Sequence, residues 1–337
     1  MRLSVPLSLE PMEAEPVQEL PSGPDWVFEP KYDGFRCLAF RDGEEVALQS
    51  RRQRPLARFF PEVAANIAAL PAPRFVLDGE LVIFGKEFDT LQLRLHPAAS
   101  RIAKLSREAP ATFVAFDLLL DESGRNALEW PFSRRRAALA ALFEKFDRHD
   151  GVVLSKETTK QGEARRWLDD AGRGLDGIVA KRLDLPYQPG RREMLKFKIW
   201  HSVDCVVGGV YFKPGTQTIE YLLCGLYDAA GRLNYVGRCA PGDGEAAARI
   251  RPLIGGEGFT GEAPGGPSRW SRRERAVTPL RPELVVEVSA DHITAGKFRH
   301  GSRLIRWRDD KDPRRCTMDQ IERDDAASHR AGGADPT

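Results

Sequence analysis

The sequence predicts an α+β fold with two domains, and three observations support this prediction. The chain has 337 residues, more than one typical hydrophobic core needs. In its first two hundred residues, short apolar runs alternate with amphipathic helical patterns, which favours antiparallel sheets with helices over a regular doubly wound sheet. After residue 203, short strand patterns separated by Gly, Pro and Asp predominate. We therefore expect domains over residues 1–200 and 201–318, followed by a disordered tail over 319–337.

Both helices and strands are predicted in the first domain. Apolar residues at helical spacing predict two helices, the second after a candidate N-cap at Ser133. Their apolar positions are Phe60, Val63, Ile67 and Leu70, and then Leu139, Leu142, Phe143 and Phe146. Strand-like runs cover Phe75–Phe84, Thr112–Leu120 and Gly177–Ala180.

The second domain is expected to be a small β-barrel. Five short strand patterns are interrupted by one helical pattern at Glu245–Ile254 and by a Gly/Pro-rich surface loop at Gly255–Pro267. The strand patterns are Val203–Tyr211, Glu220–Tyr227, Leu233–Arg238, Leu284–Val288 and Leu304–Arg308. Five strands with one helix are typical of an oligonucleotide-binding (OB) barrel.

Composition narrows the class of protein. The net charge is only +2, yet residues 269–315 hold 13 Lys/Arg against 7 Asp/Glu, which suits either phosphate contact or a solvated surface. Five scattered cysteines without a Cys-x-x-Cys pair argue against a structural zinc site and fit a reducing cytoplasm. We expect no signal peptide, no membrane span and no P-loop nucleotide site.

The segment Lys31–Arg36 (Lys-Tyr-Asp-Gly-Phe-Arg) suits a lysine that attacks phosphorus. Nearby cations and partial burial favour the neutral amine, which can then form a covalent intermediate. Asp33 lies on the same side of an extended chain as Lys31 and could orient the amine or help hold a metal. Gly34 permits a tight turn or a close approach to phosphate. Taken alone, the segment is more simply interpreted as a surface loop of mixed charge.

Two later segments place polar or aromatic side chains inside apolar strands. In Asp78-Gly79-Glu80 the two carboxylates share one strand face. Inside a core they need a cation, a metal or a hydroxyl as partner, and the alternative is a half-exposed strand with solvated acids. In Phe116-Asp117 the aromatic ring could stack on a purine, whereas a phenylalanine in a hydrophobic core is the simpler interpretation.

Three further segments suit anions and divalent cations. Asp176–Lys181 carries a hard oxygen ligand of the kind that Mg²⁺ prefers, or is a strand with charged ends. Lys196 and Lys198 lie on one face of an extended segment, where an anion between them offsets their repulsion. Lys297-Phe298-Arg299, Arg303 and the segment Arg306–Lys311 suit pyrophosphate or a nucleic-acid backbone.

In order and spacing, these segments resemble those of the covalent nucleotidyltransferases, and most closely the ATP-dependent DNA ligases. The resemblance runs from about residue 10 to residue 318 and includes Ser50-Arg51-Arg52 as an arginine motif. It is strongest to small bacterial ligases of the ligase C type and to the ligase module of bacterial end-joining ligase D. One departure is Asp176, where the family usually has Glu.

The resemblance implies a nucleotidyltransferase domain, with ATP-grasp-like antiparallel sheets and helices, followed by an OB-fold barrel. It also implies roles for individual residues. Lys31 and Asp33 would be catalytic, and Glu80 and Asp176 would hold Mg²⁺ or Mn²⁺. ATP or AMP would contact Lys31 together with Glu29, Arg36, Arg51, Glu80, Phe116, Lys196, Lys198, Arg308 and Lys311. DNA would contact Arg36, Arg51, Arg299, Arg303 and Arg306.

The implied reaction transfers AMP from ATP to Lys31, then to a 5′-phosphate at a nick, and finally joins the 3′-hydroxyl. The expected partners are nicked duplex DNA and repair proteins such as a polymerase or end-binding factors. We expect a monomer in the cytoplasm at the nucleoid, with a hinge near Ile199–Ser202 that moves the barrel. An mRNA guanylyltransferase, an RNA ligase and a non-catalytic nucleic-acid-binding module are the alternatives. Use of NAD⁺ is disfavoured.

Overall fold

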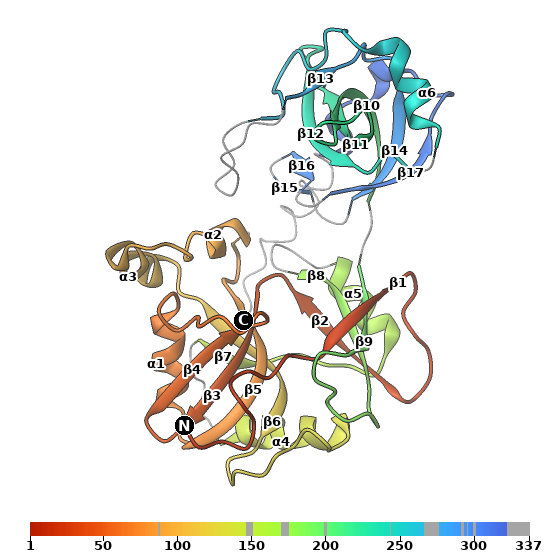
Figure 1. Ribbon diagram of the computed structural model, residues 1–337. Coiled ribbons are helices and arrows are strands. Elements are labelled where there is room, and N and C mark those ends of the chain that lie inside the picture. Colours follow the sequence, from red (N-terminus) through yellow and green to blue (C-terminus); the bar gives the residue numbers. More distant parts are fainter. Residues whose placement is uncertain are drawn as a thin grey trace. The chain divides into compact units, whose positions relative to one another are not determined.

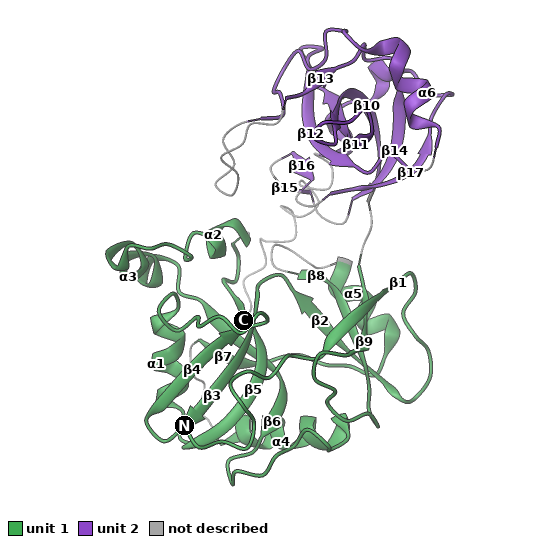
Figure 2. Cartoon of the chain, viewed as in Figure 1, with its two compact units in different colours: residues 1–198 green, residues 199–337 purple. Residues whose placement is uncertain are grey.

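The computed structural model describes ten segments of the chain, which folds into two compact units. The described residues are 1–86, 88–145, 151–169, 175–198, 201–242, 244–265, 276–290, 293–294, 296–298 and 301–321. Unit 1 is Met1–Lys198 and unit 2 is Ile199–Thr337, shown in green and purple in Figure 2. Of the predicted tail, only residues 319–321 are among the described residues.

Unit 1 contains two sheets (Figure 1). The five-stranded sheet has the order β4-β3-β5-β6-β7, with strands Glu45–Ser50, Phe35–Asp42, Arg74–Val82, Thr112–Leu120 and Val152–Leu154. The four-stranded sheet has the order β1-β9-β8-β2, with strands Glu13–Val17, Arg192–Phe197, Leu175–Arg182 and Trp26–Tyr32. The sheets are not purely antiparallel as expected, because β1 pairs with β9 and β6 with β7 in parallel.

Helices cover one face of each sheet. The helices of unit 1 are α1 (Pro61–Ala69), α2 (Phe88–Gln92), α3 (Ala99–Glu108), α4 (Phe132–Glu144) and α5 (Gln161–Asp169). Val63 of α1 and Leu139 of α4 share a core with Leu77 of the five-stranded sheet. Ala164 of α5 packs with Phe28 and other residues of the four-stranded sheet.

The other face of the five-stranded sheet packs towards the four-stranded sheet. Leu38 and Val76 on that face share a core with Met12, Tyr187 and Met194 from the N-terminal segment and the β8–β9 region. Because side chains alternate along a strand, Asp78 and Glu80 lie on the same face as Val76. The polar residues of β5 are therefore directed towards the strand that carries Lys31.

Two expected helices differ in their bounds. Helix α4 begins at Phe132 with Pro131 as its N-cap, so Ser133 lies inside the helix rather than at its cap. The predicted Phe146 lies outside the described residues. The helix expected at Glu245–Ile254 is α6 (Ala246–Ile250) followed by the 3₁₀ turn η1 (Arg251–Leu253), because Pro252 cannot donate a helical hydrogen bond.

Unit 2 is built on a six-stranded sheet. Its order is β12-β11-β10-β14-β17, with strands Leu233–Cys239, Ile219–Tyr227, His201–Phe212, Val285–Ala290 and Arg303–Trp307, and β13 (Thr278–Pro279) pairs with β10. A separate pair is formed by β15 (Ile293–Thr294) and β16 (Lys297–Phe298), and the 3₁₀ turn η2 covers Pro313–Arg315. One isolated bridge joins Cys239 at the end of β12 to Ser302 before β17.

All five cysteines are free thiols buried in cores. Cys37 lies in the five-stranded sheet of unit 1, and the other four belong to the core of unit 2. Those four are Cys205, Cys224, Cys239 and Cys316. The prediction that the cysteines are reduced agrees with this arrangement.

Candidate active site

Most of the predicted residues of unit 1 come together between its two sheets. Lys31 lies near the end of β2, and β2 pairs with β8 so that Lys31 is opposite Gly177. The neighbour of that glycine, Asp176, accepts a hydrogen bond from Lys31 Nζ at 2.5 Å. β9 pairs with the other edge of β8, which places Lys196 opposite Val179. Strand pairing thus assembles residues that are some 145 positions apart in the chain.

Two glycines let the strands approach this closely. A Cβ at Gly34, in the turn between β2 and β3, would lie 2.1 Å from the carbonyl oxygen of Leu81 on β5. Gly177 has φ +147°, and a Cβ there would lie 2.1 Å from the carbonyl oxygen of Phe197 on β9. Gly34 therefore lies in a turn, as predicted, and its missing side chain also allows close contact with β5.

Asp176 is held by two lysines. Besides Lys31, the Lys198 ammonium lies 3.1 Å from the same carboxylate oxygen. Burial alone would raise the pKa of Asp176, but the two ammonium groups hold that pKa below its ordinary value. In this state Lys31 is engaged by a carboxylate, and this pair must open before the amine can attack.

Lys196 adds a third cation. Its pKa is lowered by burial and by repulsion from Lys31 and Lys198. Three lysines with one carboxylate carry a net positive charge, so the cluster favours a bound anion. This arrangement suits a phosphate group next to Lys31 Nζ.

Glu80 approaches the cluster from the five-stranded sheet. Burial raises the pKa of its carboxyl to about 7, although Arg36 and Lys31 act in the opposite direction. Asp33, on the turn after β2, acts on the same carboxyl and helps to raise its pKa. Asp176 and Glu80 are therefore both close enough to Lys31 to interact with its ammonium electrostatically.

Arg36 is fixed by a buried network. Its Nε and Nη2 atoms each donate to Asp78, at 2.6 Å, and Nη2 also donates to the carbonyl of Met12 at 3.1 Å. Asp78 is fully buried and accepts a further bond from the Tyr187 hydroxyl at 2.6 Å. Tyr187 in turn accepts from the backbone N–H of Met12. One hydroxyl thus links the five-stranded sheet to the β8–β9 connection and the N-terminal segment.

Phe116 lies among cations. The guanidinium carbon of Arg36 is 4.6 Å from its ring centroid and Lys181 Nζ is 4.7 Å away. The ring is 9% exposed. A purine that stacks on Phe116 must therefore share the ring with these cations. The sequence suggested the stacking but not the cations around the ring.

Glu29 is almost fully buried in an ion-pair network. Lys181 Nζ lies 2.9 Å from its Oε2 atom and Arg136 lies 4.0 Å from Oε1. Burial raises the pKa of Glu29, with the two cations acting against it. Its Oε1 atom is buried without a hydrogen-bond partner, so the predicted ATP-binding residue retains an acceptor.

The predicted metal ligands supply hard oxygen donors of the type that Mg²⁺ and Mn²⁺ prefer. Asp176 on β8, next to β2, and Glu80 on β5 of the other sheet both interact with Lys31, so the residues present fit a divalent cation next to this lysine. Within the described residues, no group of three or more His, Cys, Asp or Glu forms a preassembled metal site. Phosphate oxygens and water would have to complete the coordination.

Arg51 lies outside this cluster of contacts. It is more than half exposed in the turn after β4 and lies 3.7 Å from Glu13, which also pairs with Arg192. Its ion pair therefore joins it to β1 and β9 rather than to Lys31.

The predicted residues of unit 2 form their own group. Arg308 and Lys311 both pair with Asp204, at 2.9 and 3.2 Å, and Arg306 pairs with Glu287 at 2.7 Å. Arg303 is exposed on β17. Arg299 lies outside the described residues, as do residues 199 and 200 of the predicted hinge.

Two supporting residues could not be recognised from the sequence. Tyr187 stands in the connection between β8 and β9, where no periodic pattern marks it. Arg135 on α4 is fully buried and makes a bidentate pair with Asp117, at 2.7 and 3.0 Å. It lies in a run of three arginines that would suggest a solvated helix face.

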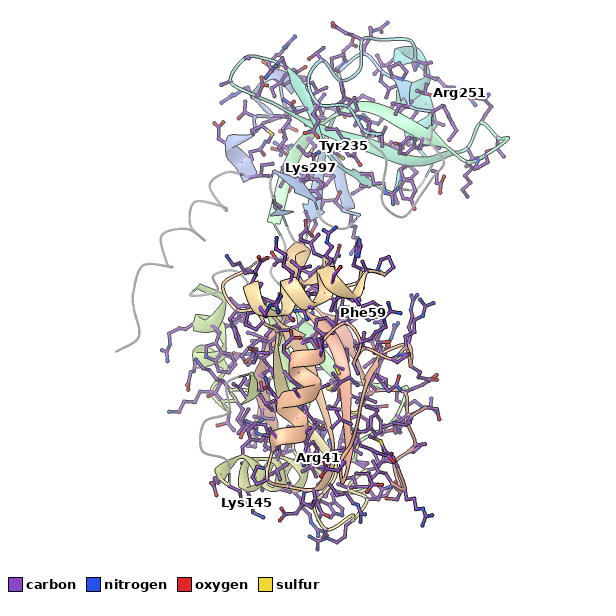
Figure 3. All side chains as sticks on the ribbon, turned by 90° about the vertical axis from the view of Figure 1, so that its left-hand side faces the viewer. Arg41, Phe59, Lys145, Tyr235, Arg251 and Lys297 are labelled. Carbon is purple, nitrogen blue, oxygen red and sulfur yellow. The ribbon has the colours of Figure 1, made fainter. Side chains whose placement is uncertain are left out.

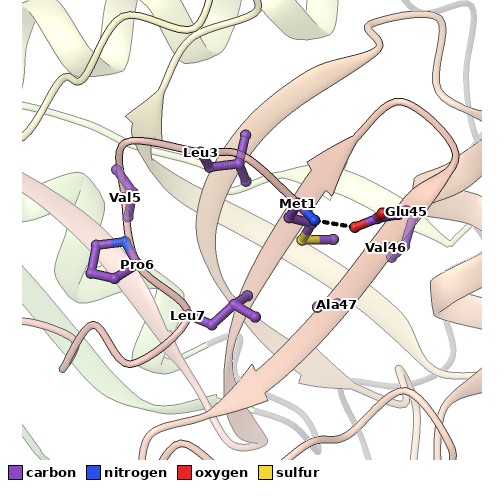
Figure 4. Close-up of a pocket in the computed structure, with 8 residues that line it drawn as sticks. All are labelled: Met1, Leu3, Val5, Pro6, Leu7, Glu45, Val46 and Ala47. Carbon is purple, nitrogen blue, oxygen red and sulfur yellow. Dashed lines mark hydrogen bonds and ion pairs between the residues drawn. The ribbon is translucent and has the colours of Figure 1, made fainter.

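A pocket of about 420 Å³ lies apart from these residues (Figure 4). It is lined by Met1, Leu3, Val5, Pro6, Leu7, Glu45, Val46 and Ala47. The N-terminal ammonium pairs with Glu45 there, and the rest of the lining is apolar. None of the predicted site residues lines it.

Comparison with known proteins gives matches along almost the whole chain. The family model "ATP dependent DNA ligase domain" matches residues 11–198, and "ATP dependent DNA ligase C terminal region" matches residues 215–311. The chain is 41% identical to DNA ligase C2 of Mycolicibacterium smegmatis and 39% identical to DNA ligase C of Mycobacterium tuberculosis. Each of these matches covers 96% of this chain and 96% of the relative.

A solved structure of a Lig E DNA ligase has a similar fold. It is 18% identical, with a TM-score of 0.57, and the match covers 88% of this chain and 99% of that chain. At this identity the similarity supports the fold alone. Among the described residues, no helix is both long enough and apolar enough to span a membrane.

Proposed function

The chain belongs to the family of ATP-dependent DNA ligases, and we propose that it seals nicks in duplex DNA through an AMP adduct on Lys31. Its catalytic activity is that of a DNA ligase that uses ATP. The observation that carries the proposal is a cluster in which Asp176 contacts both Lys31 and Lys198, while Lys196 and Glu80 are close enough to Lys31 to interact with it electrostatically. That environment accepts a phosphate beside an amine.

In the first step, Lys31 Nζ attacks the α-phosphorus of ATP. A phosphorus–nitrogen bond forms, the bond to the β-phosphate oxygen breaks, pyrophosphate leaves, and the amine gives up its proton. An incoming triphosphate competes with Asp176 for the ammonium groups of Lys31 and Lys198, which opens the pair that engages Lys31 in the free protein. Lys196 and Lys198 hold the α-phosphate, and Asp33 orients the amine.

The second and third steps move AMP and join the strands. A 5′-phosphate oxygen at the nick attacks the adenylyl phosphorus and Lys31 leaves, and then the 3′-hydroxyl attacks the DNA phosphorus and AMP departs. Because Asp78 and Met12 engage Nε and Nη2 of Arg36, the Nη1 edge is the part of its guanidinium that would reach the ribose or the nick phosphate. Arg51 would contact the DNA backbone.

The nucleotide base is assigned to the region around Phe116 and Glu29. The ring of Phe116 would stack on adenine, and the Oε1 atom of Glu29, which has no hydrogen-bond partner, is an acceptor suited to the adenine amino group. Glu80 and Asp176 would hold Mg²⁺ or Mn²⁺, which when bound neutralises phosphate charge and favours the unprotonated lysine.

Unit 2 is proposed to close as an OB-fold barrel that grips DNA. The backbone N–H of Ser302 donates to the carbonyl of Arg238 at 2.9 Å, which links the two edge strands β12 and β17 of the sheet. Arg303 and Arg306 on β17, with Arg299, would contact the DNA backbone, and Arg308 and Lys311 would orient the leaving pyrophosphate. To contact DNA in one step and pyrophosphate in another, unit 2 must move on a hinge near residues 199–202.

The proposed partners and cellular compartment are those of an enzyme that acts on DNA. Nicked duplex DNA is the proposed partner, with repair polymerases or end-binding factors as further partners of a monomeric enzyme. Five buried free thiols suit the reducing cytoplasm, where the nucleoid supplies the substrate.

The deciding experiment is incubation of the protein with ATP and Mg²⁺, followed by peptide mass spectrometry. We expect an AMP-sized adduct on Lys31 that pyrophosphate removes and that nicked DNA discharges. Lys31→Ala should give no adduct, and labelled GTP should give none with the unaltered protein. An adduct formed with GTP alone would point to an mRNA guanylyltransferase, and no adduct with any nucleotide would overturn the mechanism.

A further inference from the structure

Unit 1 carries a basic surface that contains none of the proposed catalytic residues. Arg101, Lys104 and Arg107 are exposed on α3, three residues apart. Exposed Arg58, from the segment before α1, donates to the carbonyl of Pro97 at 3.2 Å and so lies at the start of α3. We call these four residues the α3 basic surface. Two segments some forty residues apart therefore contribute to one cationic area.

A buried arginine anchors this surface. Arg94, fully buried between α2 and α3, lies 2.7 Å from Glu62 of α1 and donates to the carbonyls of Phe59 and Ala109. Its guanidinium also lies 5.0 Å from the Phe60 ring centroid. Breaking a buried pair of this kind is strongly destabilising, so α3 is held in a defined position on α1. The exposed cations project from a fixed support.

Acidic residues do not neutralise the surface. The segment 51–58 contains four arginines and no acid, and α3 contains one acid, Glu108. Glu108 lies 3.7 Å from Lys104, and both side chains are more than half exposed. An exposed pair of this type contributes little in water, so a phosphate can displace the carboxylate at low cost.

Segments that adjoin the α3 basic surface also adjoin residues of the proposed active site. Phe88 of α2 packs edge-on against Phe35 at 5.1 Å, and Phe35 follows Gly34 in the nucleophile segment. On the other side, residues 51–54, which include the proposed DNA contact Arg51, lead along the chain to Arg58. Figure 3 looks onto this side of unit 1 and labels Phe59, the neighbour of Arg58, close to α3.

We propose that the α3 basic surface binds the phosphates of the duplex that flanks the nick. From Arg101 to Arg107 the helix rises by about 9 Å, a length over which one DNA strand presents about three phosphates. This inference rests on the proposed function, because it assigns the surface to the DNA that the active site seals. Its contribution is binding without sequence preference, and it takes no part in the transfer of AMP to Lys31.

The test compares two triple variants by nicked-duplex binding at several salt concentrations. In Arg101→Gln/Lys104→Gln/Arg107→Gln, the slope of log affinity against log salt should fall by up to about 2.7, with a ten-fold or greater loss of affinity near 0.1 M salt. The control removes the same charge from three other exposed residues, as Arg125→Gln/Arg134→Gln/Lys145→Gln, which lie in the β6–α4 connection, on α4 and at the C-terminal end of α4. We expect the control to keep the slope of the unaltered protein.

Adduct formation separates this inference from the proposed function. The α3 variant should form the Lys31 adduct with ATP at the unaltered rate, because no DNA takes part, and should then discharge it slowly onto nicked DNA. An unchanged salt slope in the α3 variant would overturn the inference, as would an equal change in the control. Failure of the unaltered protein to form the adduct would instead overturn the proposed function.

Discussion

Replacing Glu80 by glutamine should make the stability of unit 1 less sensitive to pH. In the folded protein, burial raises the pKa of Glu80 to about 7, against an ordinary value of 4.5. Between these two values the unfolded chain has lost a proton that the folded chain retains. The free energy of unfolding of the unaltered protein therefore falls as pH rises through this window, and the contribution is constant below and above it.

The size of the effect follows from the two pKa values. A difference of about 2.5 pH units at roughly 1.36 kcal/mol per unit corresponds to about 3 kcal/mol. Glu80→Gln keeps the shape of the side chain but cannot ionise. Its stability advantage over the unaltered protein should therefore grow by about 3 kcal/mol from pH 4.5 to pH 8. Transfer of AMP should be slower in the same variant, because a proposed metal ligand is lost.

Urea unfolding followed by tryptophan fluorescence at several pH values measures this difference. Contributions from titrating groups that do not interact with Glu80 cancel when the variant is subtracted from the unaltered protein. Glu44→Gln, in the exposed turn between β3 and β4, is the matched control for the loss of a carboxyl. A stability difference for Glu80→Gln that does not change with pH would refute the reasoning that burial controls this carboxyl.

Three further changes test other parts of unit 1. Arg135→Met leaves the Asp117 carboxylate buried without its bidentate partner and should lower the free energy of unfolding by about 3–5 kcal/mol in urea; a loss below about 1 kcal/mol would contradict this. Gly177→Ala places a Cβ against the Phe197 carbonyl and should lower stability by about 1–3 kcal/mol in thermal unfolding, whereas an unchanged midpoint would argue against close β8–β9 pairing. The lowered pKa of Asp176 contributes stability that is lost as the pH falls through that pKa. Asp176→Asn should therefore show a flatter acid-unfolding curve below about pH 4. An unchanged curve would disprove the pairing of Asp176 with the two lysines.

The sequence was enough to predict a candidate nucleophile and its main neighbours because these depend on local pattern. Lys31, Asp176, Lys196 and Lys198 each belong to a strand-like segment, and order along the chain was enough to relate them to one family. Their chemistry could be predicted from residue type. Alternation along β5 also correctly placed Asp78 and Glu80 on one face, with the apolar residues Leu77 and Leu81 buried on the other.

What the sequence could not predict are contacts between strands that are far apart in the chain. No local pattern indicates that Tyr187 donates to Asp78, or that the buried Arg135 holds Asp117 from a run of arginines. The choice of Asp176 as the direct partner of Lys31 depends on how β2 and β8 pair. Glu29 was assigned to ATP, yet its ion pair with Lys181 appears only once the strands are paired.

Helix ends were the least accurate part of the prediction. Ser133 is a good capping residue by type, but Pro131 already ends the preceding extended segment, so the helix begins one residue before Ser133. In unit 2 the periodic pattern continued past Pro252, where the α-helical hydrogen bonds cannot continue.

The distribution of buried thiols gives the chain a built-in reporter of unfolding. Burial raises the pKa of Cys37 well above its ordinary value, so a thiol-alkylating reagent should react with it only when unit 1 opens. The remaining four cysteines all lie in the core of unit 2. Intact-protein mass spectra after brief alkylation would thus distinguish the two events, because opening of unit 1 adds one label and opening of unit 2 adds four.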